Sequence, residues 1–101
     1  LLTLEIYKVT KKFPKEELFG LTSQMRRSVY SIPTNIAEGC GRNSNAQLVN
    51  FLQIATGSCS EIQYQLMLSK ELLYITEELF SELHKEAVEI RKMIFKYSEK
   101  L

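Results

Sequence analysis

The sequence has few of the residues that end regular secondary structure. Its 101 residues include only four glycines and two prolines, and it has no tryptophan. A fold of many short strands needs a turn about every 8–12 residues. The scarcity of glycine and proline therefore favours long helices. With 45% hydrophobic and 25% charged residues, the composition is that of one soluble globular domain, expected to span residues 1–101.

A strong charge of either sign is absent as well. The formal net charge is +1, so no long-range field draws in nucleic acid or an anionic membrane. No apolar run approaches the roughly 20 residues of a membrane-spanning helix, and no signal peptide is recognised. We therefore expect a cytoplasmic protein without membrane contact. Because the chain begins LLTLEIYK, already in helical period, we expect the first helix to be truncated at its N-terminus.

Residue sets for catalysis or metal binding are missing too. His84 is the only histidine, and it stands one position off a hydrophobic seam, which indicates a surface or flanking position. One histidine and two unpaired cysteines cannot form a transition-metal site. Nucleophile elbows, phosphate-binding glycine loops and dinucleotide fingerprints are also absent. The sequence thus predicts a protein that is not an enzyme and holds no metal or cofactor.

The two cysteines, Cys40 and Cys59, sit in no paired spacing. They allow either one disulfide or two free thiols. A pair without a recognisable framework is more typical of free thiols in a reducing compartment, which is the interpretation we favour.

Apolar residues do recur, at steps of three and four, in four segments. The first expected helix spans residues 1–12. The second is capped by Thr22 or Ser23 and ends near Glu38. The third, of about 30 residues, is capped by Ser44, and the fourth is capped by Thr76. A short helical turn is expected within the connector of residues 14–20. Heptad spacing in several helices predicts an all-α, left-handed, antiparallel up-down-up-down four-helix bundle.

Three details of the helices are also predicted. The apolar period continues past Pro33, so the second helix should bend there without breaking. Gly39 and Gly41 should end that helix with positive φ angles, and Gly57 should mark a close approach of a neighbouring backbone. The seam of the third helix is expected to comprise Leu48, Leu52, Ala55, Cys59, Ile62, Leu66, Ser69 and Leu73. A parallel stripe on the same helix includes Gln65 and gives it a second contact face.

Three arginines, Arg26, Arg27 and Arg42, stand in a segment with a single acid, Glu38. Guanidinium groups bind phosphate bidentately, so these arginines are candidates for contact with RNA or DNA. The competing interpretation is ion pairing, either of Arg26 with Glu61 or with a neighbouring subunit. Glu61 falls within an apolar stripe, where an unpaired carboxylate is costly.

Residues 28–37 form a run without a single charge. A helix of a monomer that faces water normally carries lysine or glutamate within ten residues. Such a surface suits packing against another protein chain, and burial on all sides within one bundle is the alternative. The candidate contact residues are Tyr30, Ser31, Pro33, Thr34 and Asn35.

Several of these stretches resemble a known family. They are residues 13–17 (FPKEE), 19–27 (FGLTSQMRR), 31–39 (SIPTNIAEG) and 51–58 (FLQIATGS), followed by Glu61. They resemble the four-helix bundle proteins encoded by intervening sequences of bacterial large-subunit ribosomal RNA genes, often called ribosomal-protein-like. They are also similar to the accessory variability determinants of diversity-generating retroelements.

The resemblance implies a bundle that assembles as a homopentamer, and accessory proteins of this kind bind nucleic acid and a reverse transcriptase. Our first hypothesis is therefore a non-enzymatic oligomer that binds structured RNA or DNA, or a partner such as a reverse transcriptase. The second hypothesis is a structural or protein–protein adaptor without nucleic-acid binding. The first hypothesis predicts that the chain binds RNA with an affinity that falls steeply as salt rises, and the second does not.

Overall fold

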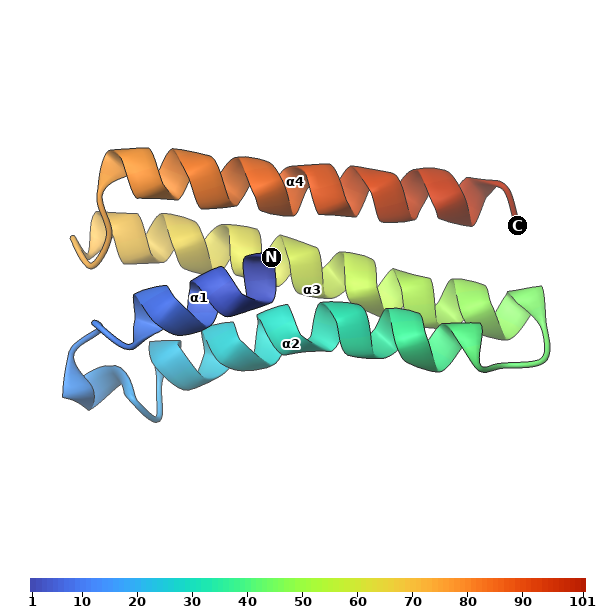
Figure 1. Ribbon diagram of the computed structural model, residues 1–101, viewed down its shortest axis with the longest axis horizontal. Helices are drawn as coiled ribbons and strands as arrows, with labels where there is room; N and C mark the ends of the chain where they lie inside the picture. The colour runs from blue at the N-terminus through green and yellow to red at the C-terminus, as the bar shows by residue number, and fades with distance from the viewer.

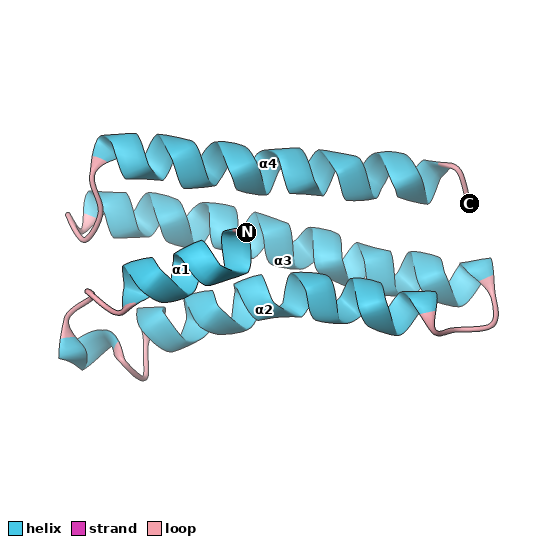
Figure 2. Ribbon diagram, viewed as in Figure 1, coloured by secondary structure: helices cyan, strands magenta, loops and turns pink.

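The computed structural model describes residues 1–101 and contains only helices and their connections (Figures 1 and 2). The α-helices are α1 (Leu2–Thr10), α2 (Leu21–Cys40), α3 (Asn45–Glu71) and α4 (Glu77–Glu99), and a 3₁₀ turn, η1 (Lys15–Glu17), joins α1 to α2. The predicted all-α four-helix fold is confirmed, and so is the helical turn in the first connector. The colours in Figure 1 show consecutive helices running in opposite directions along the long axis of a body of 43 × 24 × 18 Å. The left-handed sense of the helix packing stays a prediction.

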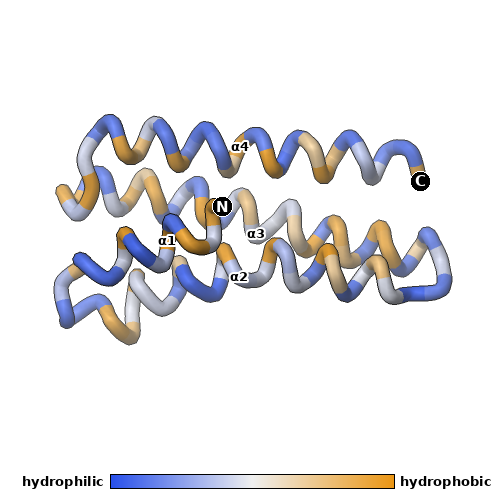
Figure 3. Tube along the Cα trace, in the orientation of Figure 1, coloured by the Kyte–Doolittle hydropathy of each residue, from blue (hydrophilic) through white to orange (hydrophobic).

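The core lies between α3 and the helices on its two sides. α3 packs along α2 and α4, whereas the short α1 lies against α2 and touches α4. Sixteen buried hydrophobic residues form one cluster, to which the helices contribute Ile6, Met25, Leu66 and Leu83 among others. Figure 3 shows the hydrophobic turns of α4 on the side that faces α3 and its hydrophilic turns on the opposite side. The amphipathic periodicity of the sequence thus corresponds to burial.

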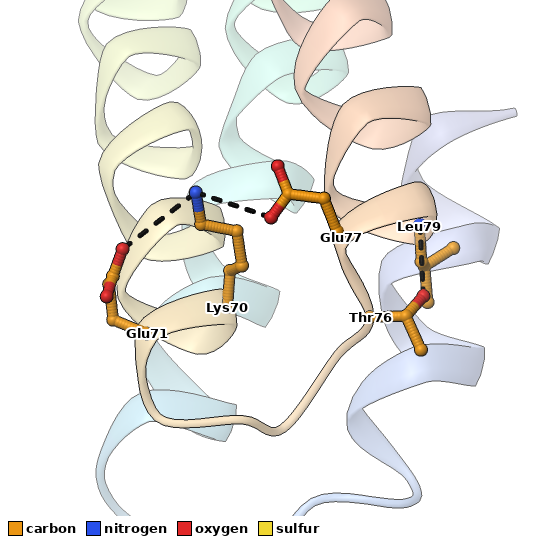
Figure 4. A network of polar contacts seen from close by, with 5 residues as sticks. All are labelled: Lys70, Glu71, Thr76, Glu77 and Leu79. Atoms are coloured by element: carbon orange, nitrogen blue, oxygen red, sulfur yellow. Dashed lines mark hydrogen bonds and ion pairs between the residues drawn. The ribbon is translucent and has the colours of Figure 1, made fainter.

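Two of the predicted helix caps are present. Ser44 Oγ accepts a hydrogen bond from the Gln47 amide at 3.2 Å, and Thr76 Oγ1 accepts one from the Leu79 amide at 3.1 Å. Figure 4 shows the second cap beside Lys70, whose Nζ lies 3.8 Å from Glu71 and 3.7 Å from Glu77. These contacts hold the connection between α3 and α4 at both of its ends.

The predicted cap of α2 was wrong. The helix begins at Leu21, one residue before Thr22, and neither Thr22 nor Ser23 caps it. The Leu21 amide donates instead to Glu17 Oε1 at 3.2 Å. The carboxylate of η1 therefore supplies the acceptor that a threonine or serine cap was expected to provide.

The glycine predictions were also wrong. No glycine has a positive φ, and Gly39 lies buried inside α2, which continues to Cys40. At Gly57, no atom beyond its chain neighbours and its own helix backbone lies within 4 Å of the position a Cβ would take, whereas a Cβ on Gly39 would meet Leu48 and Phe51 of α3 at 2.9 Å. The close approach of two helices therefore occurs at Gly39. The continuity of α2 through Pro33 is confirmed.

The seam of α3 is confirmed as far as Ser69 but not at Leu73. Leu73 has φ 64° and is 88% exposed. Its amide donates to the Lys70 carbonyl, and the Tyr74 amide donates to the Ser69 carbonyl, both at 2.9 Å. This pair of bonds is a Schellman motif, which ends α3 after 27 residues and points Leu73 away from the core.

Both cysteines are free, but their surroundings differ. Cys40 is exposed at the end of α2, and Cys59 is fully buried in the seam of α3. Burial raises the pKa of the Cys59 thiol to about 11, an effect that the positive charge of Arg91 partly offsets. Because the thiolate is the reactive form, Cys59 should be inert in the folded chain.

We expect one thiol per chain to react rapidly with Ellman's reagent at pH 8, and the second only in denaturant. The Cys40→Ser variant should lose the rapid phase, and Cys59→Ser, as the matched control, should keep it. Two thiols that react at equal rates in the folded protein would contradict the placement of Cys59.

Candidate interaction surface on α2 and α3

The side chain of Arg26 makes its contacts within the chain. Its Nε donates to Thr10 Oγ1 at 2.9 Å, its Nη2 donates to the Tyr7 carbonyl at 3.4 Å, and its guanidinium lies 5.0 Å from the centre of the Tyr7 ring. These contacts fasten α1 to α2. The ion pair of Arg26 with Glu61 suggested by the sequence is not formed, because Arg26 faces α1 and Glu61 belongs to α3.

Arg42 also has partners within the chain, whereas Arg27 has none. Arg42 forms an ion pair with Glu38, one turn earlier, and its guanidinium lies 4.9 Å from the centre of the Phe51 ring. Arg27 is exposed, and it makes no hydrogen bond or ion pair in the chain. The structure thus separates the three candidate arginines, and Arg27 is the one whose charge has no internal partner.

Arg27 borders two depressions of the surface. The first, which we call the aromatic hollow, has a volume of about 470 Å³ and is lined by Tyr7, Leu18, Phe19, Thr22, Ser23, Arg26, Arg27 and Tyr30. Phe19 is 93% exposed there. The hollow contains two guanidinium groups, three aromatic rings and no carboxylate, so an anion that carries flat rings would fit its chemistry.

The second depression, the polar groove, lies between α2 and α3 and has a volume of about 350 Å³. It is lined only by polar side chains: Gln24, Arg27, Ser28 and Ser31 of α2, and Ser58, Glu61 and Gln65 of α3. Ser58 Oγ donates to Ser31 Oγ at 2.8 Å and so links α3 to α2 beside the groove. Gln65 is only 7% exposed, and its Oε1 has no hydrogen-bond partner. An acceptor that is buried without a donor costs free energy in the folded chain.

The predicted contact residues occupy the adjoining face of α2. Tyr30 is 58% exposed, Pro33 and Thr34 are exposed, and Ser31 and Asn35 are half-buried. Two of these side chains form hydrogen bonds within α2: Thr34 Oγ1 donates to the Tyr30 carbonyl, and Asn35 Nδ2 donates to the Ser31 carbonyl and to Ser31 Oγ, all at 2.8 Å. The run is therefore not buried on all sides within one bundle. Covering it would leave few polar groups unpaired, which lowers the cost of a protein contact.

Sequence reasoning missed the polar groove. It assigned Glu61 to an apolar stripe, whereas Glu61 is exposed, and it assigned Gln65 to a second contact face without recognising its polar neighbours. A signal was present. Ser28 and Ser31 are three residues apart on α2, and Ser58, Glu61 and Gln65 follow steps of three and four on α3, so each set forms a polar stripe on one side of its helix.

The remaining chemical groups do not form a site. No three His, Cys, Asp or Glu side chains come together in a metal-binding arrangement. His84 is half-buried, and its ring centre lies 5.0 Å from that of Phe80. No helix combines the length and apolar character that crossing a membrane requires.

Comparison with known proteins agrees with this architecture. The chain is similar to a Bacteroides thetaiotaomicron protein of unknown function from the S23 ribosomal protein family, with 28% sequence identity and a TM-score of 0.89 over 96% of this chain and 91% of that one. A search of curated proteins finds no match. The profile of the 23S rRNA-intervening sequence proteins matches residues 1–96. The chain therefore belongs to the 23S rRNA-intervening sequence protein family.

Proposed function

We propose that this chain is a non-enzymatic, oligomeric helical-bundle module whose uncharged α2 face and polar groove contact another protein chain, in the first place a second copy. The observation that carries the proposal is the face of Tyr30, Pro33 and Thr34, which is exposed, carries no charge and has the Thr34 hydroxyl hydrogen-bonded within α2. Neither the family nor the similar structure indicates an enzymatic activity. A pentamer is the assembly that the sequence resemblance implies, and it is part of this proposal.

Light scattering after size exclusion tests the assembly. We expect a mass that is a multiple of 11.7 kDa, with five chains as the specific expectation. Thr34→Lys places a charge in the proposed contact and should shift the mass toward one chain, because an unpaired charge is costly to bury. Ser81→Lys, at an exposed position of α4, is the matched control and should leave the mass unchanged. A wild-type mass of one chain would overturn the proposal.

Nucleic-acid binding is the second candidate, and the aromatic hollow is the observation that favours it. Arg26 and Arg27 supply positive charge beside Phe19 and Tyr30, and no carboxylate lines the hollow. Unpaired bases stack on aromatic rings and guanidinium planes, while phosphates pair with arginine. The ion pair with Glu38 offsets the charge of Arg42, which makes Arg42 a weaker candidate for phosphate contact than Arg27. The same surface would then serve binding of structured RNA or DNA, alone or together with a processing enzyme such as a reverse transcriptase.

Fluorescence anisotropy with a structured RNA, measured from low to physiological salt, tests this second candidate. Affinity should fall steeply with salt, and Arg27→Ala should reduce the slope of log affinity against log salt by about 1. Lys92→Ala on α4 removes an equal charge from an exposed position remote in sequence, and it should change the slope less. Binding that is undetectable, or insensitive to salt and to Arg27→Ala combined with Arg26→Ala, would exclude this candidate.

A further inference from the structure

The outward face of α3 is a second uncharged surface of the chain. Between residues 45 and 69 of this helix only Glu61 is charged, whereas α4 carries ten charged residues among its 23. Ile54 is 50% exposed on this face, and Gly57 and Glu61 are exposed beside it. A helix with one side in water normally has the charge content of α4. The outward face of α3 thus has the same character as the uncharged face of α2.

We propose that the uncharged face of α2 packs on the outward face of α3 in the next copy, in a ring whose axis runs along the helices. A closed ring of more than two identical chains needs two different surfaces on each chain, because every copy meets one neighbour through one surface and the other neighbour through the second. The α2 face is one of these surfaces, and the outward face of α3 is the other. This inference rests on the self-association proposed above and names the second half of the contact.

The directions of the two helices fit such a ring. α2 and α3 run in opposite directions within the bundle (Figure 1). Rotation about an axis along the bundle preserves the direction of each helix, so α2 of one copy runs antiparallel to α3 of the next. This is the arrangement in which α2 and α3 already pack within the chain.

The same rotation keeps every residue at its height along the axis, so residues of α2 and α3 that are level within the chain meet between copies. The hydrogen bond between Ser31 and Ser58 marks one such level. Thr34 lies three residues after Ser31, and Ile54 lies four residues before Ser58 on the antiparallel helix. The two therefore differ in level by only one residue, about 1.5 Å. Ile54 of one copy would meet Thr34 of its neighbour.

The neighbouring levels are complementary as well. By the same count, Arg27 and Glu61 differ in level by one residue, so the charge beside the α2 face and the single charge of the α3 face are opposite in sign. Tyr30 and Gly57 differ by two residues, about 3 Å. The exposed ring of Tyr30 needs space in the neighbour, and Gly57 has no side chain to fill it.

Cross-linking of single-cysteine variants tests the contact between copies. In a Cys40→Ser background, which removes the exposed thiol, Thr34→Cys and Ile54→Cys are refolded together and treated with a short thiol cross-linker. We expect covalent dimers that contain one chain of each variant. Each variant alone should form none, and a chain that carries both cysteines should form a ladder of up to five chains.

Met67→Cys is the matched control for this experiment. Met67 is also exposed on α3, but it lies 13 residues, about 20 Å, further along the helix than Ile54. Mixed with Thr34→Cys, it should form no dimers. Dimers of Thr34→Cys alone would show that α2 meets α2 and would overturn the inference. A cross-link that forms in the chain with both cysteines but not in the mixture would be internal to one chain and would overturn it too.

A charge placed on the α3 face provides an independent test. Ile54→Lys should raise the dissociation constant of the assembly at least about tenfold in a sedimentation dilution series, because an unpaired charge is costly to bury. Met67→Lys makes a similar exchange outside the contact and should leave the constant nearly unchanged. Gly57→Val should weaken association by narrowing the space for Tyr30, while the dissociated chain keeps its stability. Circular dichroism establishes that each variant is folded.

The possible failures are distinguishable. A monomeric wild-type protein overturns the proposed function together with this inference. A wild-type oligomer in which the mixed cysteine variants form no dimers and Ile54→Lys leaves the dissociation constant unchanged overturns this inference alone, and it would show that another surface faces α2.

Discussion

Replacing Leu66 by alanine is expected to lower the free energy of unfolding by about 3 kcal/mol, within the range observed when buried leucines are truncated. Leu66 is 0% exposed and belongs to the single core cluster. It lies on α3, the helix that packs against both α2 and α4, so few atoms can move to fill the space. Urea denaturation followed by circular dichroism, at one fixed protein concentration, measures the change.

The neighbouring residue provides the control for this prediction. Met67 is 44% exposed on the same helix, so Met67→Ala should cost about 1 kcal/mol or less, as is usual for surface positions. The two substituted residues are consecutive in α3, and only Leu66 belongs to the buried seam. Equal losses of stability would show that the assigned seam of α3 is wrong.

The parts of the fold that depend on local spacing could be predicted from the sequence. Periodicity of three and four residues identified the buried seam of α3 because that period places side chains on one face of a helix. The caps at Ser44 and Thr76 were predictable because each hydroxyl bonds an amide three residues later. Such contacts require no knowledge of how the helices are arranged.

Features that depend on contacts between segments could not be predicted in the same way. The α2 cap comes from Glu17 in a separate turn, and the partner of Arg26 is α1, sixteen residues away. Gly57 and Gly39 look alike in the sequence, and only the packing of α2 on α3 shows which of them meets a neighbour. The termination at Leu73 requires a left-handed residue that is not glycine, which sequence patterns do not anticipate.

The candidate surface was predicted only in part. The uncharged run of α2 was visible in the sequence, and the structure shows Tyr30, Pro33 and Thr34 exposed, with the Thr34 hydroxyl hydrogen-bonded within α2. The residues of the polar groove beside it come from two helices, so they do not lie close together in the sequence. Gln65 illustrates the difference: its orphaned acceptor becomes apparent only when its surroundings are known.

Gly39→Val is the second substitution with a large expected effect. A Cβ at Gly39 would lie 2.9 Å from Leu48 Cδ1, 2.9 Å from Phe51 Cβ and 3.4 Å from the Leu48 carbonyl oxygen. Phe51 Cβ is bound directly to the backbone of α3, so relief requires α3 to move away from α2. Valine adds this Cβ and two methyl groups beyond it. We expect a loss of about 3 kcal/mol, at the upper end of the usual cost of overpacking.

The matched control is Gly57→Val, because Gly57 is also inside a helix, but apart from its chain neighbours and its own helix backbone no atom lies within 4 Å of the position that a Cβ would take. Valine and glycine differ by less than about 0.5 kcal/mol in helix propensity, so this variant should keep nearly the wild-type stability. Thermal unfolding of the two variants separates a packing effect from a backbone effect. Since valine is the better helix former of the two, equal losses in both variants could not come from helix propensity, and they would show that the loss is not specific to the close contact between α2 and α3. If only Gly39→Val lost stability, Gly39 would be the position that sets how closely the C-terminal half of α2 approaches α3, and with it the alignment of the uncharged face.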